Sequence, residues 1–228
     1  MPMASVERYE FHTHTLLSDG DLILSEHVRR AEKAGVTVLA VTDHADASNL
    51  EDLLNAYRRF MELEAARYAV RVVPGVELTH VPPDLIDELA RQAKALGARV
   101  VGVHGETIVE PVAPGTNRAA VTSRHVDFLA HPGFLTAEEA LAAAAGGVCL
   151  ELTARQGHCL TNGHVAQVAR AAGAALIVNS DAHAPEDLID AVFAWQVARA
   201  AGLSDTEANA ATLVNPRRLF ERVSATDG

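Results

Sequence analysis

The stretch FHTHTLLSDG, Phe11–Gly20, places two histidines one residue apart and an aspartate five residues after the second. Side chains alternate along an extended strand with a period of two, so His12 and His14 are expected to point to the same side. Two imidazoles in that arrangement can reach one metal ion. Pairs of this kind also occur by chance. Whether this pair binds metal therefore depends on what the rest of the chain supplies.

Outward from that stretch, short runs rich in β-branched residues alternate with amphipathic or alanine-rich segments such as DLIDELARQAKALG. Capping boxes, Thr136 with Glu139 and Ser204 with Glu207, mark two predicted helix starts. This alternation is typical of parallel βα units, which close into a barrel or remain an open doubly wound sheet. No Gly-x-Gly-x-x-Gly turn follows a strand, so a dinucleotide-binding sheet has no support. The predicted strands are Tyr9–His12, Val36–Thr42, Val70–Pro74, Arg99–Val103, Val126–Ala130, Val148–Leu152 and Ala175–Asn179.

Composition narrows the class of protein. The 228 residues are 49% hydrophobic and 21% charged, which predicts one globular domain over residues 1–228. We find no uninterrupted apolar run of membrane-spanning length and no signal segment, and Cys149 and Cys159 form no disulfide framework, so we expect a cytoplasmic protein without membrane contact. A net charge of −11 argues against stable nucleic-acid binding.

Histidines and carboxylates follow nearly every predicted strand. The C-terminal ends of the strands of a parallel α/β barrel meet on one face, so these residues are expected to converge. A single histidine there is usually a partly buried residue, and a single carboxylate is usually a helix cap. Their recurrence at consecutive strand ends instead predicts a metal site. The residues are His12, His14, Asp19, Asp43, His44, Glu77, His104, His131, Glu151, Asp181 and His183.

The kinds of side chain at the strand ends indicate the metal and its chemistry. Imidazoles and carboxylates suit zinc, iron and manganese, and no thiolate is offered. Six histidines and three carboxylates (Asp19, Glu77 and Asp181) are too many for one four-coordinate ion and fit two or three divalent ions. Clustered cations acidify a water and stabilise charge on the attacking and leaving oxygens, so hydrolysis of phosphate esters is the reaction that gains most.

The motifs HTHTLLSDG, TDH, PGVE, VHGE, AHPG and NSDAH follow one another in this order. Over Glu7 to about Asp187, the chain resembles the PHP (polymerase and histidinol phosphatase) family. The resemblance implies a distorted seven-stranded (β/α)7 TIM-like barrel that holds up to three metal ions and hydrolyses phosphomonoesters or phosphodiesters. It also implies attack on phosphorus by a metal-bound hydroxide while another ion accepts the leaving oxygen.

The same resemblance implies which residues share an ion. His12, His14, Glu77 and Asp181 would hold the first, Glu77 would bridge to a second held with His104 and His131, and Asp19, His44 and His183 would hold the third. Some relatives have histidine where this chain has Asp19. A carboxylate there is a harder ligand, so we expect the third position to favour manganese or iron.

Further residues are expected to assist. Arg118 and Arg155 follow strands and are candidates for a phosphate clamp, although surface arginines are common. His80, His158 and His164 lie near strand ends and are candidates for protonating the leaving group or lining the pocket. Asp43 is expected to orient a ligand without contacting the ion, and Glu151 to do the same or to face substrate. Two histidines, His27 and His125, are expected to be structural or on the surface.

Three alternatives remain at this point. Metal-dependent amidohydrolases also begin with His-x-His, but many bridge two ions with a modified lysine, and here Lys33 and Lys94 fall inside predicted helices. A phosphodiesterase or nuclease acting on short oligonucleotides is a second, and a non-catalytic metal-binding module is a third. We expect a small phosphomonoester as substrate, as for a histidinol phosphatase; the sequence indicates no oligomeric state.

Overall fold

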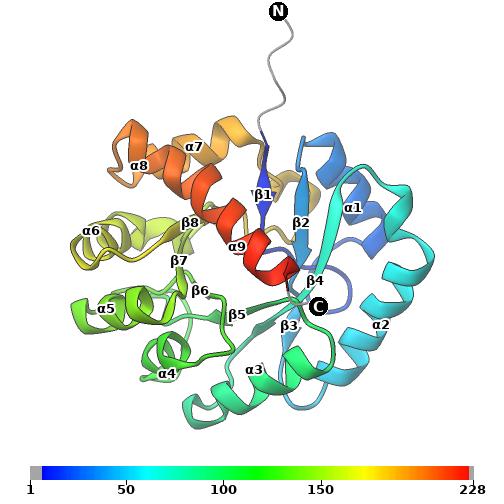
Figure 1. The fold of residues 1–228 in the computed structure, drawn as a ribbon, viewed down its shortest axis with the longest axis horizontal. Helices are drawn as coiled ribbons and strands as arrows, with labels where there is room; N and C mark the ends of the chain where they lie inside the picture. The colour runs from blue at the N-terminus through cyan, green and yellow to red at the C-terminus, as the bar shows by residue number, and fades with distance from the viewer. Residues whose placement is uncertain (1–6, 226–228) are drawn as a thin grey trace, which may run out of the picture.

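The computed structural model describes residues 7–225 and shows a nearly closed barrel of parallel strands surrounded by helices (Figure 1). Seven strands follow the order β1-β2-β4-β5-β6-β7-β8, and a short β3 pairs with β4. This confirms the predicted (β/α)7 barrel over the open sheet. The strands are β1 (Tyr9–Glu10), β2 (Val38–Val41), β3 (His44–Ala45), β4 (Arg71–Leu78), β5 (Val100–His104), β6 (Phe128–Ala130), β7 (Cys149–Thr153) and β8 (Leu176–Asn179).

Helices connect successive strands and cover the outside of the barrel. Both predicted capping boxes are present: Thr136 accepts from the backbone of Glu139, and Ser204 from that of Glu207. The helices are α1 (Leu24–Lys33), α2 (Leu50–Leu63), α3 (Ile86–Ala95), α4 (Thr116–Thr122), α5 (Ala137–Gly146), α6 (Asn162–Ala172), α7 (Ala191–Ala200), α8 (Asp205–Asn209) and α9 (Asn215–Ser224). None of the helices in residues 7–225 is both long and apolar enough to cross a bilayer.

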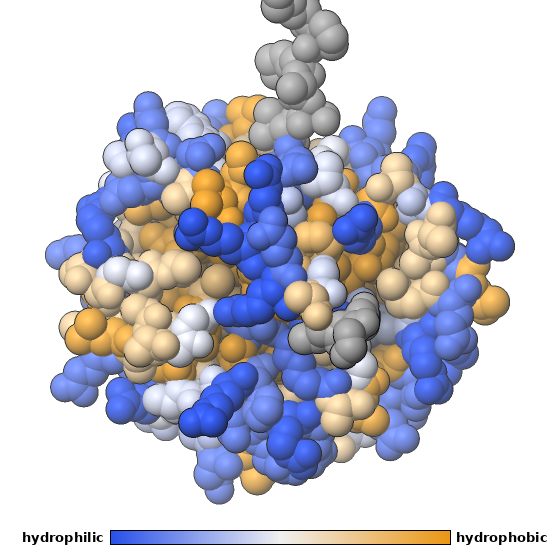
Figure 2. Space-filling view, in the orientation of Figure 1, coloured by the Kyte–Doolittle hydropathy of each residue, from blue (hydrophilic) through white to orange (hydrophobic). Residues whose placement is uncertain are grey.

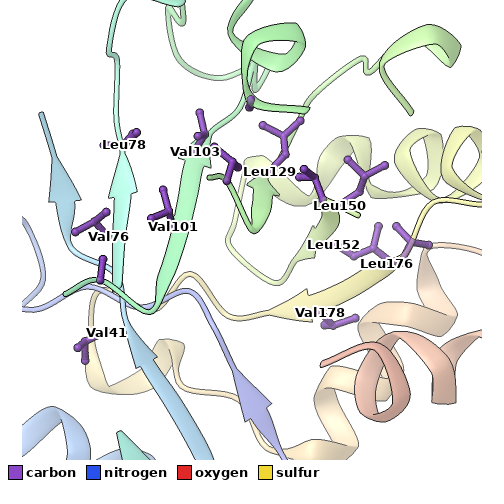
Figure 3. Packing of buried hydrophobic residues seen from close by; sticks show 14 of the residues in the cluster. Val41, Val76, Leu78, Val101, Val103, Leu129, Leu150, Leu152, Leu176 and Val178 are labelled. Carbon is purple, nitrogen blue, oxygen red and sulfur yellow. The ribbon is translucent and has the colours of Figure 1, made fainter. Parts of the chain in front are cut away.

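Side chains that alternate along each strand form two apolar layers, one outside and one inside the barrel. Val76, Val101 and Leu150 face outward and pack with the surrounding helices in one large buried cluster (Figure 3). Inward-facing residues such as Val73, Val100 and Ile177 form a second cluster inside the barrel. Because both faces of the sheet are buried, the strands are nearly continuous apolar runs, as the sequence shows.

The barrel interior changes from apolar to polar along each strand. On β4 the inward position near the strand start is Val73, and the one near its end is Glu77; on β5 these positions are Val100 and His104. Gly102 lies between the two on β5, where a Cβ atom would come within 2.3 Å of the Phe128 ring. The interior therefore has an apolar floor, and the polar side chains stand above it.

Every strand differs from its predicted bounds by at least one residue, and the differences at β4 and β1 have structural reasons. β4 continues past Pro74 to Leu78, because Pro74 lies where pairing with β2 ends and pairing with β5 begins, so its missing N–H breaks no ladder. β1 ends at Glu10 rather than His12. The backbone beyond it makes only an isolated bridge, Thr13 to Ala182. The short strand β3 was not expected, and it places His44 directly opposite Glu77.

Side chains complete the seam between β1 and β8. The N–H of Phe11 donates to Asn179 Oδ1 at 3.0 Å, and Glu10 accepts from the N–H groups of His12 and Ser180 at 3.2 and 3.0 Å. Arg8, which is 1% exposed, pairs with Glu10 at 2.6 Å and also donates to the Val178 carbonyl. Buried side chains therefore supply the hydrogen bonds that a regular ladder would have made here.

The last helix closes one end of the barrel. In α9, Leu219 and Val223 pack against Tyr9, Val38 and other residues at the starts of the strands. Figure 1 shows α9 crossing this end, and Figure 2 shows strongly hydrophilic side chains gathered over its middle. The polar interior residues consequently open toward the opposite end, where the strands finish.

Candidate metal centre

The structure gathers all nine predicted ligands at the carboxyl ends of the strands. Each group of ligand atoms lies within 4.8 Å of one another. The groups are His14, Asp19, His44 and His183; His12, Glu77 and His131; His12, His14 and Asp181; and His80, His104 and Glu110. Eight of the nine predicted ligands thus fall in the first three groups, and the ninth, His104, lies in a fourth with two residues that were not predicted as ligands.

The innermost ligands surround two carboxylates. His12 Nε2 lies 3.2 Å from Glu77 Oε1, and His14 Nε2 lies 3.2 Å from Asp181 Oδ1. His131 Nε2 is 3.6 Å from an oxygen of each carboxylate. All five side chains are buried. The proximity of His12, His14, Glu77 and Asp181 agrees with the set that the family resemblance implies for one ion.

A second group stands nearer the solvent. Asp19, whose side chain is 53% exposed, places Oδ2 3.3 Å from Nε2 of both His44 and His183. His44 Nδ1 lies 2.9 Å from Glu77 Oε2, so Glu77 reaches both groups. This arrangement fits the expectation that Asp19, His44 and His183 act together. The expected bridge from Glu77 ran instead to His104 and His131, of which only His131 lies in one group with Glu77.

Buried atoms without partners test whether these residues suit a cation. Within residues 7–225, His12 Nε2, both ring nitrogens of His14 and Glu77 Oε1 make no hydrogen bond. Each buried polar atom left in this way costs about 1–3 kcal/mol, so such atoms are uncommon in folded proteins. Lone pairs of imidazole and carboxylate directed at one another are what zinc, manganese or iron would use. The residues therefore fit divalent ions.

The pKa values of the clustered side chains also agree with a site for divalent ions. Burial raises the pKa of Asp181 to about 7, against the opposing attraction of His12. Burial disfavours the charged form of His44, but its contacts with Asp19 and Glu77 raise its pKa to about 10. Protons thus balance the crowded charges in the cation-free protein. Cation binding is expected to release protons from these groups.

Glu151 orients two of the ligands. Its Oε1 lies 2.8 Å from His12 Nδ1, and its Oε2 accepts from the His131 backbone N–H at 3.0 Å. Asn179 Nδ2 donates to Glu151 at 2.8 Å. A carboxylate on the far ring nitrogen fixes the tautomer and direction of a ligating histidine. This is the supporting role that the sequence predicted for Glu151.

Asp43 acts on a loop rather than on a ligand ring. It accepts from the backbone N–H of Thr15 at 2.6 Å, from the hydroxyl of Ser18 at 2.6 Å, and from Tyr57. These contacts hold the segment that carries His14 and Asp19. Asp43 is thus placed to orient His14 and Asp19 through the backbone and loop that carry them, which agrees with the supporting role expected from the sequence.

The structure separates the two candidate phosphate-binding arginines. Arg155 is half-buried beside the ligands, with Nε 3.8 Å from Asp181 Oδ2 and a hydrogen bond of 3.3 Å to the Asp181 carbonyl. Arg118 lies exposed in the first turn of α4, where its guanidinium makes no hydrogen bond or ion pair with any residue in the described part of the chain. Arg155 is thus the arginine that the fold brings to the site.

A further carboxylate, Glu110, stands at the rim. It begins the irregular segment EPVAPGTN and lies 3.1 Å from His104, 3.3 Å from His80 and 3.3 Å from His158. The hydrogen bond from His104 lowers the pKa of Glu110 to about 2. Sequence reasoning missed Glu110 because it follows β5 by six residues, although long irregular loops are often functional.

The remaining histidines have different surroundings. His164 lies 2.7 Å from the carbonyl of Leu135, outside the four groups. His27 is buried in α1, and His125 is half-buried just before β6, away from the strand ends. A structural role for His27 and His125 agrees with these positions.

Comparisons with known proteins agree with this geometry. The model of the PHP domain matches residues 10–190. The chain belongs to the PHP domain family. An uncharacterized protein of Methanocaldococcus jannaschii is 47% identical over 218 residues, covering 95% of this chain and all of that protein. A probable phosphatase of Shewanella pealeana is 30% identical over 212 residues, covering 82% of this chain and 81% of that protein.

Solved structures resemble this PHP domain in fold. A crystal structure of an amidohydrolase has a TM-score of 0.58 at 11% identity, covering 94% of this chain and 74% of that one. At this identity the likeness concerns the barrel only. Family membership and the clustered His, Asp and Glu side chains support a metal-dependent hydrolase of phosphate esters. The acidic side chain that lies among the histidines at the end of β4 is Glu77, and no lysine lies in any of the four groups.

Proposed function

We propose that this PHP protein is a metal-dependent phosphatase of a small phosphomonoester. The observation that carries the proposal is the cluster of imidazoles and carboxylates at the strand ends, with the Arg155 guanidinium at its edge, 3.8 Å from Asp181. A terminal phosphate bears more negative charge than a diester, so it gains more from several cations and an arginine at one point.

The residues have distinct tasks in this proposal. Two or three divalent ions, when bound, would acidify a water and offset charge on the phosphate oxygens. Glu77 lies between two ligand groups and holds them at a fixed separation. Glu151 keeps His12 and His131 in place, and Arg155 donates to a phosphate oxygen. These groups are fixed before substrate arrives, because most of them are buried and packed.

The charge and shape of the protein support a small substrate. The chain carries −11 overall, which disfavours a long nucleic-acid backbone. With α9 packed over the other end of the barrel, the ligand cluster meets solvent at the strand ends, where Asp19 and His44 are partly exposed. Histidinol phosphate is one candidate among phosphorylated metabolites. We propose a cytoplasmic location and no stable nucleic-acid partner.

A substrate screen tests the proposal. Protein loaded with Mn²⁺ is assayed on p-nitrophenyl phosphate, bis-p-nitrophenyl phosphate, a panel of phosphorylated metabolites, short oligonucleotides and simple cyclic amides. We expect phosphate release from monoesters to be fastest. Faster cleavage of diesters or oligonucleotides would instead show a phosphodiesterase. Absence of turnover with manganese, iron and zinc would indicate a non-catalytic metal-binding domain.

Arginine variants locate the phosphate. Arg155→Ala is expected to raise KM for the best monoester by about tenfold or more, since it removes a charged hydrogen-bond donor. Arg118→Ala is the matched comparison, because Arg118 is exposed on α4. An unchanged KM in Arg155→Ala would show that Arg155 does not hold the phosphate.

A further inference from the structure

A hollow of about 500 Å³ lies at the end of the barrel opposite the candidate metal centre. It is bounded by α2, the start of β4, the α3–β5 connection and α9, which crosses this end in Figure 1. Its volume lies in the range of sites for small organic ligands. Three arginines line it, Arg58 of α2, Arg71 at the start of β4 and Arg99 just before β5, and none of the described lining residues is acidic.

A second hollow adjoins the first and continues the positive charge. Arg99 and Val223 line both. Among the described residues, the two linings hold six of the 19 lysines and arginines of the chain but one of its 30 carboxylates, Asp127, which pairs with Lys94 and Arg222. In a chain of net charge −11, this concentration of cations attracts anions to one end of the barrel. The six cations are Arg58, Arg71, Lys94, Arg99, Arg124 and Arg222.

Two arginines of the first hollow are not neutralised by a carboxylate. Arg58 donates to a nearby amide oxygen at 2.9 Å, and Cζ of Arg71 lies 5.3 Å from the centroid of the Phe220 ring. Over residues 7–225, neither arginine makes an ion pair. A guanidinium held against an aromatic face keeps its forked N–H donors available, and these match the geometry of phosphate oxygens. Arg58 and Arg71 are therefore placed to bind a phosphate group.

The hollow also has an apolar wall. Met61, Leu96 and Phe220 line it beside the arginines, and Leu96 is 45% exposed. An inorganic anion would leave this wall in contact with water, whereas a ligand with a flat organic ring would cover it. Guanidinium groups beside apolar and aromatic side chains thus fit a phosphorylated molecule that carries a ring.

We propose that this hollow binds a nucleoside polyphosphate, at a site separate from the metal centre. The base would lie on the apolar wall of Met61, Leu96 and Phe220. The phosphates would accept from the guanidinium groups of the first hollow and extend toward Arg124 in the second. Among the described lining residues, none belongs to the four groups of candidate metal ligands, so the site does not depend on the hydrolytic activity proposed above.

Equilibrium dialysis with a non-hydrolysable ATP analogue tests the proposal, on metal-loaded protein and on protein in excess chelator. In chelator no ion at the strand ends can hold phosphate, and we expect one analogue bound per chain. Arg58→Ala and Arg71→Ala should each weaken this binding about tenfold or more, since each removes a charged donor. Arg118→Ala is the matched control, because Arg118 is exposed on α4 and lines neither hollow. It should bind as the wild type does.

Adenosine and pyrophosphate separate the two walls of the hollow. Each offers only one half of the ligand, so each should bind at least about tenfold more weakly than the analogue. Three outcomes would overturn the site: no binding in chelator, equal weakening in Arg118→Ala, or pyrophosphate binding as tightly as the analogue. The first would leave the metal centre as the one place for phosphate, and the other two would show diffuse attraction of anions. Lack of phosphatase activity would reject the proposed function and leave this test unaffected.

Discussion

His27 shows what burial does to a single histidine outside the metal centre. It is a buried residue of α1, and its Nε2 makes no hydrogen bond in the part of the chain that the structure describes. Burial lowers its pKa from 6.5 to about 4, with Asp43 opposing. The unfolded chain, where the pKa is near its ordinary value, therefore binds more protons than the folded protein between these two pH values. Stability is expected to fall as the pH drops through this window.

The prediction is a smaller acid sensitivity in His27→Leu. Between about pH 7 and about pH 5, the titration of His27 alone is expected to lower the free energy of unfolding of the wild type by about 2 kcal/mol. Urea unfolding of metal-free wild type and His27→Leu at several pH values measures the difference. From about pH 7 upward the two stability curves should run parallel. Parallel curves throughout the acid range would show that His27 does not titrate as described.

Single residues also show how much of the candidate site could be predicted from the sequence. The nine predicted ligands follow strands whose ends converge, so topology alone brings them together. Glu110 was missed because its position depends on the path of a loop, and loop paths are not encoded by periodicity. The route by which Asp43 supports the ligands could not be predicted for the same reason. Its partners, Thr15 and Ser18, lie in a loop whose turn only the folded structure defines.

At the scale of elements, the seam between β1 and β8 depends on a buried ion pair. Arg8 and Glu10 are almost fully buried, and Glu10 also accepts from the backbone of His12 and Ser180. Removing one member of such a pair leaves the other charge uncompensated in the interior. The seam should therefore be sensitive to loss of the Glu10 charge.

We expect Glu10→Gln to lower the free energy of unfolding by about 3–5 kcal/mol. Glu26→Gln is the comparison on the surface, because Glu26 pairs with Arg30 four residues away on exposed α1 and is expected to cost less than about 1 kcal/mol. Chemical denaturation of both variants gives the two values. Similar small losses would mean that the seam is held by its backbone contacts instead.

Strand extents show how far elements could be predicted. The apolar runs of β2, β5 and β8 located these strands, since their burial on both faces is visible in the sequence. The continuation of β4 beyond Pro74 was not predicted, because it depends on which neighbour each half of the strand pairs with. β3 is two residues long and has no pattern of its own; its pairing with β4 creates it.

At the scale of the whole molecule, the candidate metal ligands come from both ends of the barrel sheet. Ligands come from the segment after β1, from β4 and from the segment after β8, so an ion bound to the inner groups holds distant parts of the chain together. Anything that binds only the folded state stabilises it by mass action. We therefore expect metal binding to stabilise the folded state of this protein.

Adding Mn²⁺ to metal-free protein is expected to raise Tm by about 5–10 °C when the free ion is about one hundred times its Kd. His14→Gln should lose much of this increase, because His14 belongs to two of the candidate ligand groups. His125→Gln, which changes a histidine away from the strand ends, should keep it. Thermal unfolding with and without chelator measures all three. An equal increase in both variants would contradict a role for His14.

The helix α9 joins the last part of the chain to the first. Leu219 and Val223 share one apolar cluster with Tyr9 and Phe11, residues separated by some two hundred positions. During synthesis the floor of the barrel stays incomplete until the final helix has emerged, however early the first strands form. Premature termination shortly before α9 would thus yield a protein with every ligand present and no closed floor beneath them, prone to self-association through the exposed apolar residues.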